Sequence, residues 1–311
     1  MRILIGCDGS NMMQIIRADL RAAGLPKEAE VIVLSVADVW LPEAWMPGAE
    51  ASGQPMVSAA VYEAIMHSGN MAKDAVEQAN QWAGVFAEDL AKDFPQWKIR
   101  TESSAASPAF AIVDRAKAWQ ADLIVVGAHT NSNIERFLLG SVSSQILAEA
   151  TCSVRVSRPH RHEGGGKQRI LIGVDGSENA LHTVEVVASR HWEHGAEACL
   201  VVAIDPSLRT ATPPLFHLFE AEISKPGQSE MEARLNAMLE QEIAKLERSG
   251  LPAISILTDG NPGKMLAEEA EQWQADVIFV GATGLRGDGG TLGRVARSVA
   301  ERAPITVEVV R

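Results

Sequence analysis

Short apolar segments alternate with amphipathic segments along the whole chain. The apolar segments are rich in β-branched residues and almost continuous in hydrophobicity, as is typical of parallel strands covered on both faces. They span residues 2–7, 31–36, 97–102, 123–128 and 152–157, and then 169–174, 199–204, 253–258, 277–282 and 305–310. Between them, apolar residues recur every three to four positions, which predicts helices with one buried stripe. Two such stripes are Val76, Trp82, Phe86 and Leu90, and Met231, Leu235, Met238, Leu239, Ile243 and Leu246.

The second half of the chain repeats the first. The sequence ILIGCDGS of residues 3–10 returns as ILIGVDGS at 170–177, and AWQADLIVVGAHT from Ala118 returns as QWQADVIFVGATG from Gln272. The offset falls from 167 to 154, which places a longer insertion in the first copy, between about residues 40 and 75. PHRHEGGGK at 159–167 has the composition of a linker. We therefore predict a first domain over 1–158 and a second over 168–311.

Strands that alternate with helices favour an α/β fold, here two tandem, open, doubly wound, five-stranded parallel sheets. Ser10 and Ser177 stand where helix N-caps belong, and Pro108 and Pro262 where first-turn residues belong. Ligands of such sheets bind outside the carboxyl ends of the strands. The loops after the first and fourth strands of each copy are therefore the candidate sites.

Composition and charge narrow the range of partners. Acidic residues outnumber basic ones by 40 to 28, a formal charge of −12, which disfavours nucleic acid as a partner. The chain has no apolar run of about 18 residues, and it opens directly on a strand-like segment, so we expect a cytoplasmic protein that binds no membrane. Cys7, Cys152 and Cys199 lie in apolar segments and read as core residues.

The loop after the first strand reads Asp8, Gly9 and Ser10 in the first copy and begins with Asp175 in the second. An Asp at the end of a strand, followed by Gly and Ser, suits a ligand hydroxyl, a base edge or a magnesium ion. The same Asp also suits a purely local role, because Asx side chains commonly bond the backbone two residues on. Both interpretations stay open at this point.

The loop after the fourth strand leads into a helix that begins with Gly and Ser. Small residues, a hydroxyl and the amides of a helix N-terminus together make an anion cradle. In the first copy the candidate residues are Gly127, Thr130, Gly140, Ser141, Val142 and Ser143. In the second copy they are Gly281, Gly284, Gly293 and Arg294.

These motifs resemble the universal stress protein family over nearly the whole chain. The shared features are the D-G-S after the first strand, the Gly260-Asn261-Pro262 lead into a helix, and the G-x-x-G loop followed by Gly-Ser. The resemblance implies a fold like that of adenine nucleotide alpha hydrolases, with strand order 3-2-1-4-5. It also implies that ATP, ADP or AMP binds, with Mg²⁺ as a possible companion. Asp8 and Val36 would meet adenine and ribose, and Gly127, Gly140, Ser141 and Val142 would meet phosphates.

Each copy departs from the family's phosphate-binding pattern. Thr130 replaces the second glycine of the first copy, and its β-branched side chain disfavours positive φ and adds bulk. In the second copy the gap is one residue short and Arg294 takes the serine position, either to neutralise phosphate or to fill the site and pair with Asp175. Because the first copy keeps Gly140-Ser141, we expect nucleotide there.

Three functions compete. The first is a stress-response module that binds an adenine nucleotide. The second is a nucleotide-free scaffold whose last strands pair through Val154, Val156, Val307 and Val309, across copies or across chains, since the family also implies a homodimer in addition to pairing within the chain. The third is a slow ATPase or autokinase that uses Ser141 or Ser143, for which the sequence supplies no evident general base. We assign no catalytic residue and no metal ligand, because His191 and His194 have no evident third ligand.

Overall fold

The computed structural model describes residues 1–39, 59–128, 139–159, 167–204, 228–284 and 292–311. The chain divides into two compact units. Unit 1 comprises Met1–Met13 and Lys27–Ile124, and unit 2 comprises Gln14–Pro26 and Val125–Arg311. The units do not coincide with the sequence repeats, because residues 14–26 and the end of the first repeat group with the second repeat.

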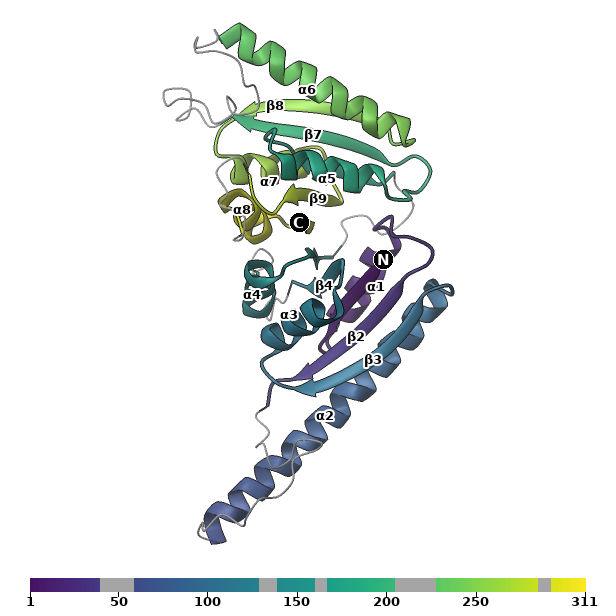
Figure 1. Ribbon diagram of the computed structural model, residues 1–311, viewed down its shortest axis with the longest axis vertical. Helices are drawn as coiled ribbons and strands as arrows, with labels where there is room; N and C mark the ends of the chain where they lie inside the picture. The colour runs from purple at the N-terminus through teal and green to yellow at the C-terminus, as the bar shows by residue number, and fades with distance from the viewer. Residues whose placement is uncertain (40–58, 129–138, 160–166, 205–227, 285–291) are drawn as a thin grey trace. The chain divides into compact units, whose positions relative to one another are not determined.

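Unit 1 contains three adjacent parallel strands, β1 (Arg2–Cys7), β2 (Glu30–Ala37) and β3 (Lys98–Ala105), with β2 in the middle. Helix α2 (Ala59–Asp93) packs on β2 and β3, and Phe86 and Leu90 of its predicted stripe are buried. This helix runs far beyond the ends of those strands (Figure 1). The insertion expected near residues 40–75 therefore ends in helix, while 40–58 lie outside the described residues. Helix α3 (Pro108–Trp119) begins with its proline, as predicted.

Two elements of the first repeat cross the boundary between the units. They are α1 (Met12–Arg21) and β4 (Leu123–Gly127). The remaining elements of this repeat, α4 (Ser141–Glu149) and β5 (Ser153–Ser157), belong to unit 2.

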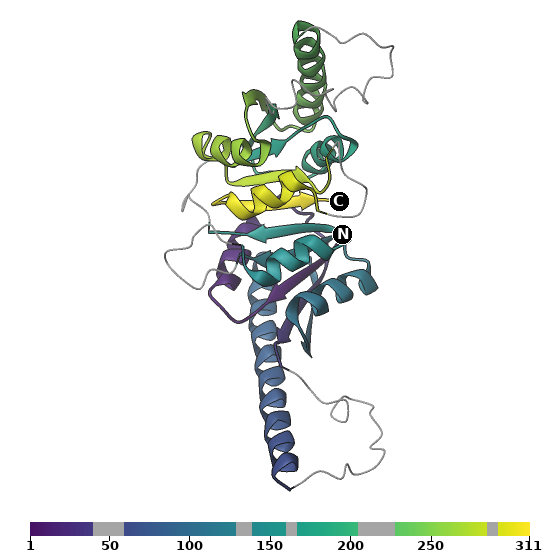
Figure 2. The same cartoon turned by 90° about the vertical axis from the view of Figure 1, so that its left-hand side faces the viewer.

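The second repeat lies wholly in unit 2 and forms a five-stranded parallel sheet. Its strands are β6 (Arg169–Gly173), β7 (Glu197–Ile204), β8 (Ala253–Asp259), β9 (Val277–Gly281) and β10 (Thr306–Val310). Their spatial order is β8-β7-β6-β9-β10, which confirms the predicted order 3-2-1-4-5. The sheet does not end at β10, because β5 pairs with it in antiparallel orientation. Figure 2 shows these two strands side by side, β10 in yellow and β5 in teal.

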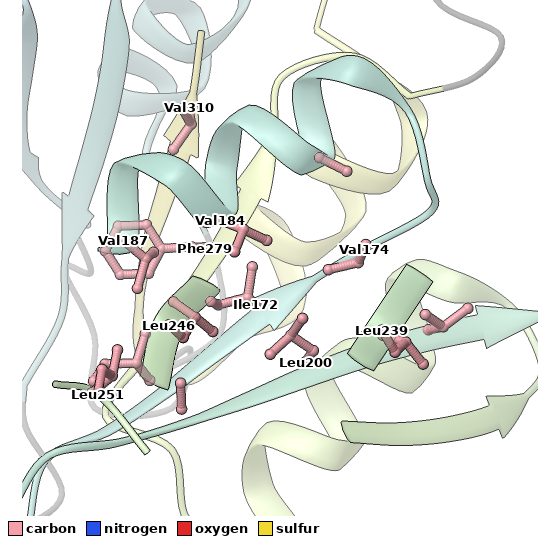
Figure 3. Packing of buried hydrophobic residues seen from close by; sticks show 14 of the residues in the cluster. Ile172, Val174, Val184, Val187, Leu200, Leu239, Leu246, Leu251, Phe279 and Val310 are labelled. Carbon is pink, nitrogen blue, oxygen red and sulfur yellow. The ribbon is translucent and has the colours of Figure 1, made fainter. Parts of the chain in front are cut away.

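Helices cover both faces of this sheet. On one face α5 (Glu178–Ala188) and α6 (Gln228–Arg248) pack against Ile172, Leu200 and Phe279, as Figure 3 shows. On the other face lies α7 (Pro262–Gln272), whose Leu266 packs so closely on Gly173 that a Cβ there would be 2.9 Å from Leu266 Cδ1. Helix α8 (Arg294–Arg302) contacts α7 and β10. A sheet with helices on both faces is the predicted doubly wound architecture.

Two of the three cysteines occupy the core positions expected from their sequence context. Cys7 and Cys199 are buried, Cys152 is half-buried, and none of the three forms a disulfide. Burial raises the pKa of Cys7 to about 11 and that of Cys199 to about 12. Both thiols are therefore protonated and unreactive near neutral pH. Within the described residues, no helix combines the length and the apolar character needed to cross a membrane.

Candidate functional site

The loop after the first strand of each repeat is held by its own aspartate. Asp175 Oδ1 accepts a 3.0 Å hydrogen bond from the amide of Ser177, and Asp8 Oδ1 accepts one of the same length from Ser10. The glycine between them adopts a left-handed φ, +79° at Gly176. The local role that the sequence left open is therefore present. It uses one oxygen of each carboxylate for the turn.

The serine of each loop serves the helix that follows, though not in the same way. Ser177 is the N-cap of α5, and its Oγ accepts from the amide of Ala180 at 3.2 Å. Ser10 lies two residues before α1, and its Oγ accepts from the amide of Met12 at 3.1 Å. The N-cap prediction is thus confirmed for Ser177. Ser10 is not the N-cap of α1, because it lies one residue before that position.

Trp82 gives the first loop a feature that sequence reasoning missed. A Cβ on Gly9, whose φ is +74°, would overlap the indole ring of Trp82 from α2. The half-buried indole therefore lies directly against the loop that carries Asp8. The sequence showed Trp82 only as part of an apolar stripe, and its position against a loop 73 residues away depends on how α2 packs.

In the second repeat the two candidate loops meet. A Cβ on Gly284 would lie 2.5 Å from Asp175 Oδ2, so the Asp175 carboxylate rests against the glycine loop. Asn179, the second residue of α5, donates a hydrogen bond to Thr283 in the same loop. Its backbone also leaves no free space for a side chain at Gly281. Neither Asn179 nor Thr283 was predicted, although Asn179 follows the D-G-S motif by only two residues.

Arg294 does not fill this site. It is the first residue of α8 and its side chain is exposed, so the predicted arrangement in which it is buried against Asp175 is wrong. The reason is geometric: Gly293 N bonds Ala282 O at 2.7 Å, which fixes the start of α8 beside β9 and directs its first side chain to solvent.

In the first repeat, the end of β4 is joined to the start of α4. Ser143 is 2% exposed, and its hydroxyl donates a 2.7 Å hydrogen bond to the carbonyl of Gly127. Ser143 therefore ties helix to strand. Its hydroxyl is committed to that bond, which argues against the predicted phosphate contact and against phosphorylation at this residue.

The other first-repeat residues around α4 remain accessible. Ser141 is exposed, while Gly140 and Val142 are partly exposed. Val36, at the end of β2 in unit 1, is half-buried. Thr130 lies outside the described residues.

Helices α4 and α8 both begin without a side-chain cap. Their N-caps are Gly140 and Gly293, and neither provides a side chain that could accept from the first helical amides. By contrast, Ser177 caps α5 and Asn261 caps α7. Amides at an uncapped N-terminus point outward and carry partial positive charge, which suits an anion. In the part of the chain that the structure describes, no three His, Cys, Asp or Glu residues gather as a metal site.

Comparisons with known proteins agree with this architecture. The family model described as "Universal stress protein family" matches residues 1–158 and 167–311. A universal stress protein of Methanocaldococcus jannaschii is 33% identical over 165 residues, which cover 52% of this chain and 84% of that protein. The crystal structure of a universal stress protein from Archaeoglobus fulgidus has a TM-score of 0.58 at 17% identity, covering 100% of this chain and 96% of that one. A universal stress protein in complex with cAMP has a TM-score of 0.35 at 23% identity, covering 47% and 98%.

Proposed function

Since the chain belongs to the universal stress protein family, we propose that it is a stress-response module that binds an adenine nucleotide of the ATP type in its first repeat. The observation that carries the proposal is the uncapped start of α4. Gly140 offers no capping side chain, Ser141 is exposed beside it, and Ser143 fastens the helix to the end of β4. A fixed and open helix N-terminus stabilises phosphate without any structural rearrangement.

The second repeat is less suited to phosphate. It has the same uncapped helix start, but the Asp175 carboxylate lies against Gly284 in the loop that would approach the phosphates. A carboxylate at that position repels an anion. Mg²⁺ bound with the nucleotide would offset this repulsion, because it prefers carboxylate and phosphate oxygens. We therefore expect any nucleotide in the second repeat to depend on Mg²⁺ more strongly than nucleotide in the first.

Binding rather than catalysis is the activity that the geometry favours. Ser143 is bonded to Gly127, while Ser141 is exposed and Ser144 partly exposed in the first turn of α4. A nucleotide bound at the start of α4 would alter the surface offered to a protein partner in the cytoplasm. A second candidate, a nucleotide-free scaffold, is favoured by the buried pairing of β5 with β10. The exposed position of Arg294 weighs against it, because Arg294 then does not fill the second site, which is the arrangement in which its side chain would exclude nucleotide.

The test is to purify the protein without added nucleotide, denature it and analyse the extract by anion-exchange chromatography. We expect adenine nucleotide in the extract. In addition, melting temperatures should be measured with ATP, GTP and inorganic triphosphate, each with and without Mg²⁺. ATP at 100 times its Kd stabilises the native state by about 2.7 kcal/mol. An extract free of nucleotide together with an unchanged melting temperature in millimolar ATP would refute the proposal in favour of the scaffold. An equal response to triphosphate would show phosphate binding without recognition of adenine.

A further inference from the structure

The pairing of β5 with β10 brings equivalent residues of the two repeats opposite each other. Both strands have five residues, and Arg155 and Glu308 are the third residue of each. In the antiparallel register Arg155 faces Glu308, Val154 faces Val309, and Val156 faces Val307. The predicted pairing of these valines across copies is thereby confirmed. Because the register is centred on Arg155 and Glu308, a local two-fold axis relates the two strands, and this pair lies on it.

Two further arginines obey the same symmetry. Arg158, directly after β5, donates to Ala300 O at 2.6 Å and to Ile305 O at 3.3 Å. Arg311, directly after β10, donates to Leu147 O at 2.6 Å and to Cys152 O at 3.3 Å. Each arginine thus binds carbonyls near the end of the other repeat's last helix. Because the two arginines make equivalent contacts, these hydrogen bonds could form between two β5 strands, between two β10 strands or between one of each. They therefore do not select a partner.

The pair on the axis breaks the symmetry. Arg155 is fully buried; its Nε and Nη2 donate to the two carboxylate oxygens of Asp19 at 2.7 Å, and its Nη1 donates to Glu308 Oε2 at 2.9 Å. The other oxygen of Glu308 accepts from Arg190. Burial alone would lower the pKa of Arg155, but Asp19 and Glu308 outweigh it and raise the pKa. These four hydrogen-bonded side chains, two cations and two anions, therefore have matched charges.

An identical pair of strands would also enclose two cations and two anions, because Asp19 belongs to the same repeat as Arg155 and Arg190 to the same repeat as Glu308, but it would place like charges next to each other on the axis. Two β5 strands, from two chains, would bring two Arg155 side chains together on the axis, and two β10 strands would bring two Glu308 side chains together. A buried charge that loses a partner is strongly destabilising, and like charges at short range in a dry site add to the cost. In a pair of β5 strands the Nη1 group of Arg155, which donates to Glu308 in this structure, would have no carboxylate in place of Glu308 to accept its hydrogen bond.

From this arrangement we infer that Arg155 and Glu308 form a specificity pair, which directs the last strand of the first repeat to the last strand of the second and rejects its own copy in another chain. Unlike charges at the symmetry axis convert a surface suited to identical partners into one that accepts only the other repeat. A homodimer that forms on top of this pairing must then use a different surface.

The test reverses each charge in the full chain. Glu308→Arg makes the junction three cations to one anion, and Arg155→Glu makes it one cation to three anions. We expect each variant to lose the β5·β10 pairing, with amide hydrogen exchange in both strands at least about 100-fold faster than in the parent protein. The matched control is Glu301→Arg, the same charge change on the exposed side of α8, which should leave exchange in these strands unchanged.

Rescue separates pairing specificity from a general loss of stability. The double variant Arg155→Glu with Glu308→Arg again has an ion pair on the axis, but its new carboxylate lies beside Asp19 and its new guanidinium beside Arg190. Exchange in both strands should therefore be slower than in either single variant, in a monomer, without reaching the parent's protection. When the two single variants are refolded together from urea, we expect a 1:1 complex of twice the 33.4 kDa chain mass by light scattering, because one junction carries the native pair and the other the reversed pair. Single variants that keep slow exchange, or a mixture and a double variant no better than the single variants, would overturn the inference. If the single variants do not fold alone, the mixed refolding decides in the same way.

Discussion

An aspartate at the start of α4 should stabilise the protein and weaken nucleotide binding at the same time. Gly140 has φ −64° and ψ 156°, an extended conformation that any residue adopts, so Gly140→Asp introduces a capping side chain without backbone strain. Relative to Gly, an Asp cap and its interaction with the helix dipole are worth about 0.3–1 kcal/mol. The melting temperature should therefore rise by a few degrees.

The same carboxylate competes with the ligand. It occupies a helix amide, which removes about 1 kcal/mol of net hydrogen bonding from phosphate. It also places a negative charge at about 5 Å from the phosphates, which costs about 3 kcal/mol at an effective dielectric constant near 20 and less after screening. A combined loss of about 3 kcal/mol corresponds to a Kd for ATP roughly 100-fold higher.

Gly140→Asn is the matched control, because asparagine caps a helix equally well and carries no charge. It should raise the melting temperature similarly and increase the Kd only about 5-fold, the effect of an occupied amide alone. Isothermal titration with ATP and thermal denaturation of the ligand-free variants measure both quantities. The reasoning is refuted if Gly140→Asp binds ATP as tightly as the parent protein while its melting temperature rises.

Two further predictions concern unit 1. Arg115 binds Glu102 in a bidentate manner at 2.6 and 2.8 Å, and this hydrogen bonding lowers the pKa of Glu102 below 4.5. A lowered carboxyl pKa gives stability that is present above the unfolded-state pKa and lost as pH falls through the folded one, so Glu102→Gln should cost about 0.5–1 kcal/mol at pH 7 and progressively less as pH falls through the lowered pKa of Glu102 in urea titrations. Gly9→Ala meets both a positive φ and the indole of Trp82, so it should cost about 2–3 kcal/mol and alter the fluorescence of Trp82, whereas Gly250→Ala meets a positive φ of +87° with no atom within 4 Å of its Cβ and should cost about 1 kcal/mol. Equal costs at the two glycines would show that Trp82 contributes nothing to the first loop.

The sequence by itself determined the fold. Apolar segments of strand length, helical stripes such as Leu235, Leu239 and Leu246, and prolines at helix starts all depend on interactions within a few residues or on a periodic pattern. The alternation of strands and helices also gave the two candidate loops, whereas the strand order came from the resemblance to the universal stress protein family.

Only the tertiary structure decided which side chains meet within these loops. Trp82 against Gly9, Asp175 against Gly284 and the exposure of Arg294 depend on how distant elements pack, and the sequence carries no local signal for such distances. The junction of β5 with β10 is the clearest case, because the sequence alone gives no reason for an arginine between the two valines of this apolar strand. The fold brings Asp19, 136 residues earlier, and Glu308, 153 residues later, within hydrogen-bonding distance of Arg155. Arg155 is fully buried there, so these carboxylates take the place of water as its partners. Burial makes such a charge costly without its partners, and only the folded chain supplies them.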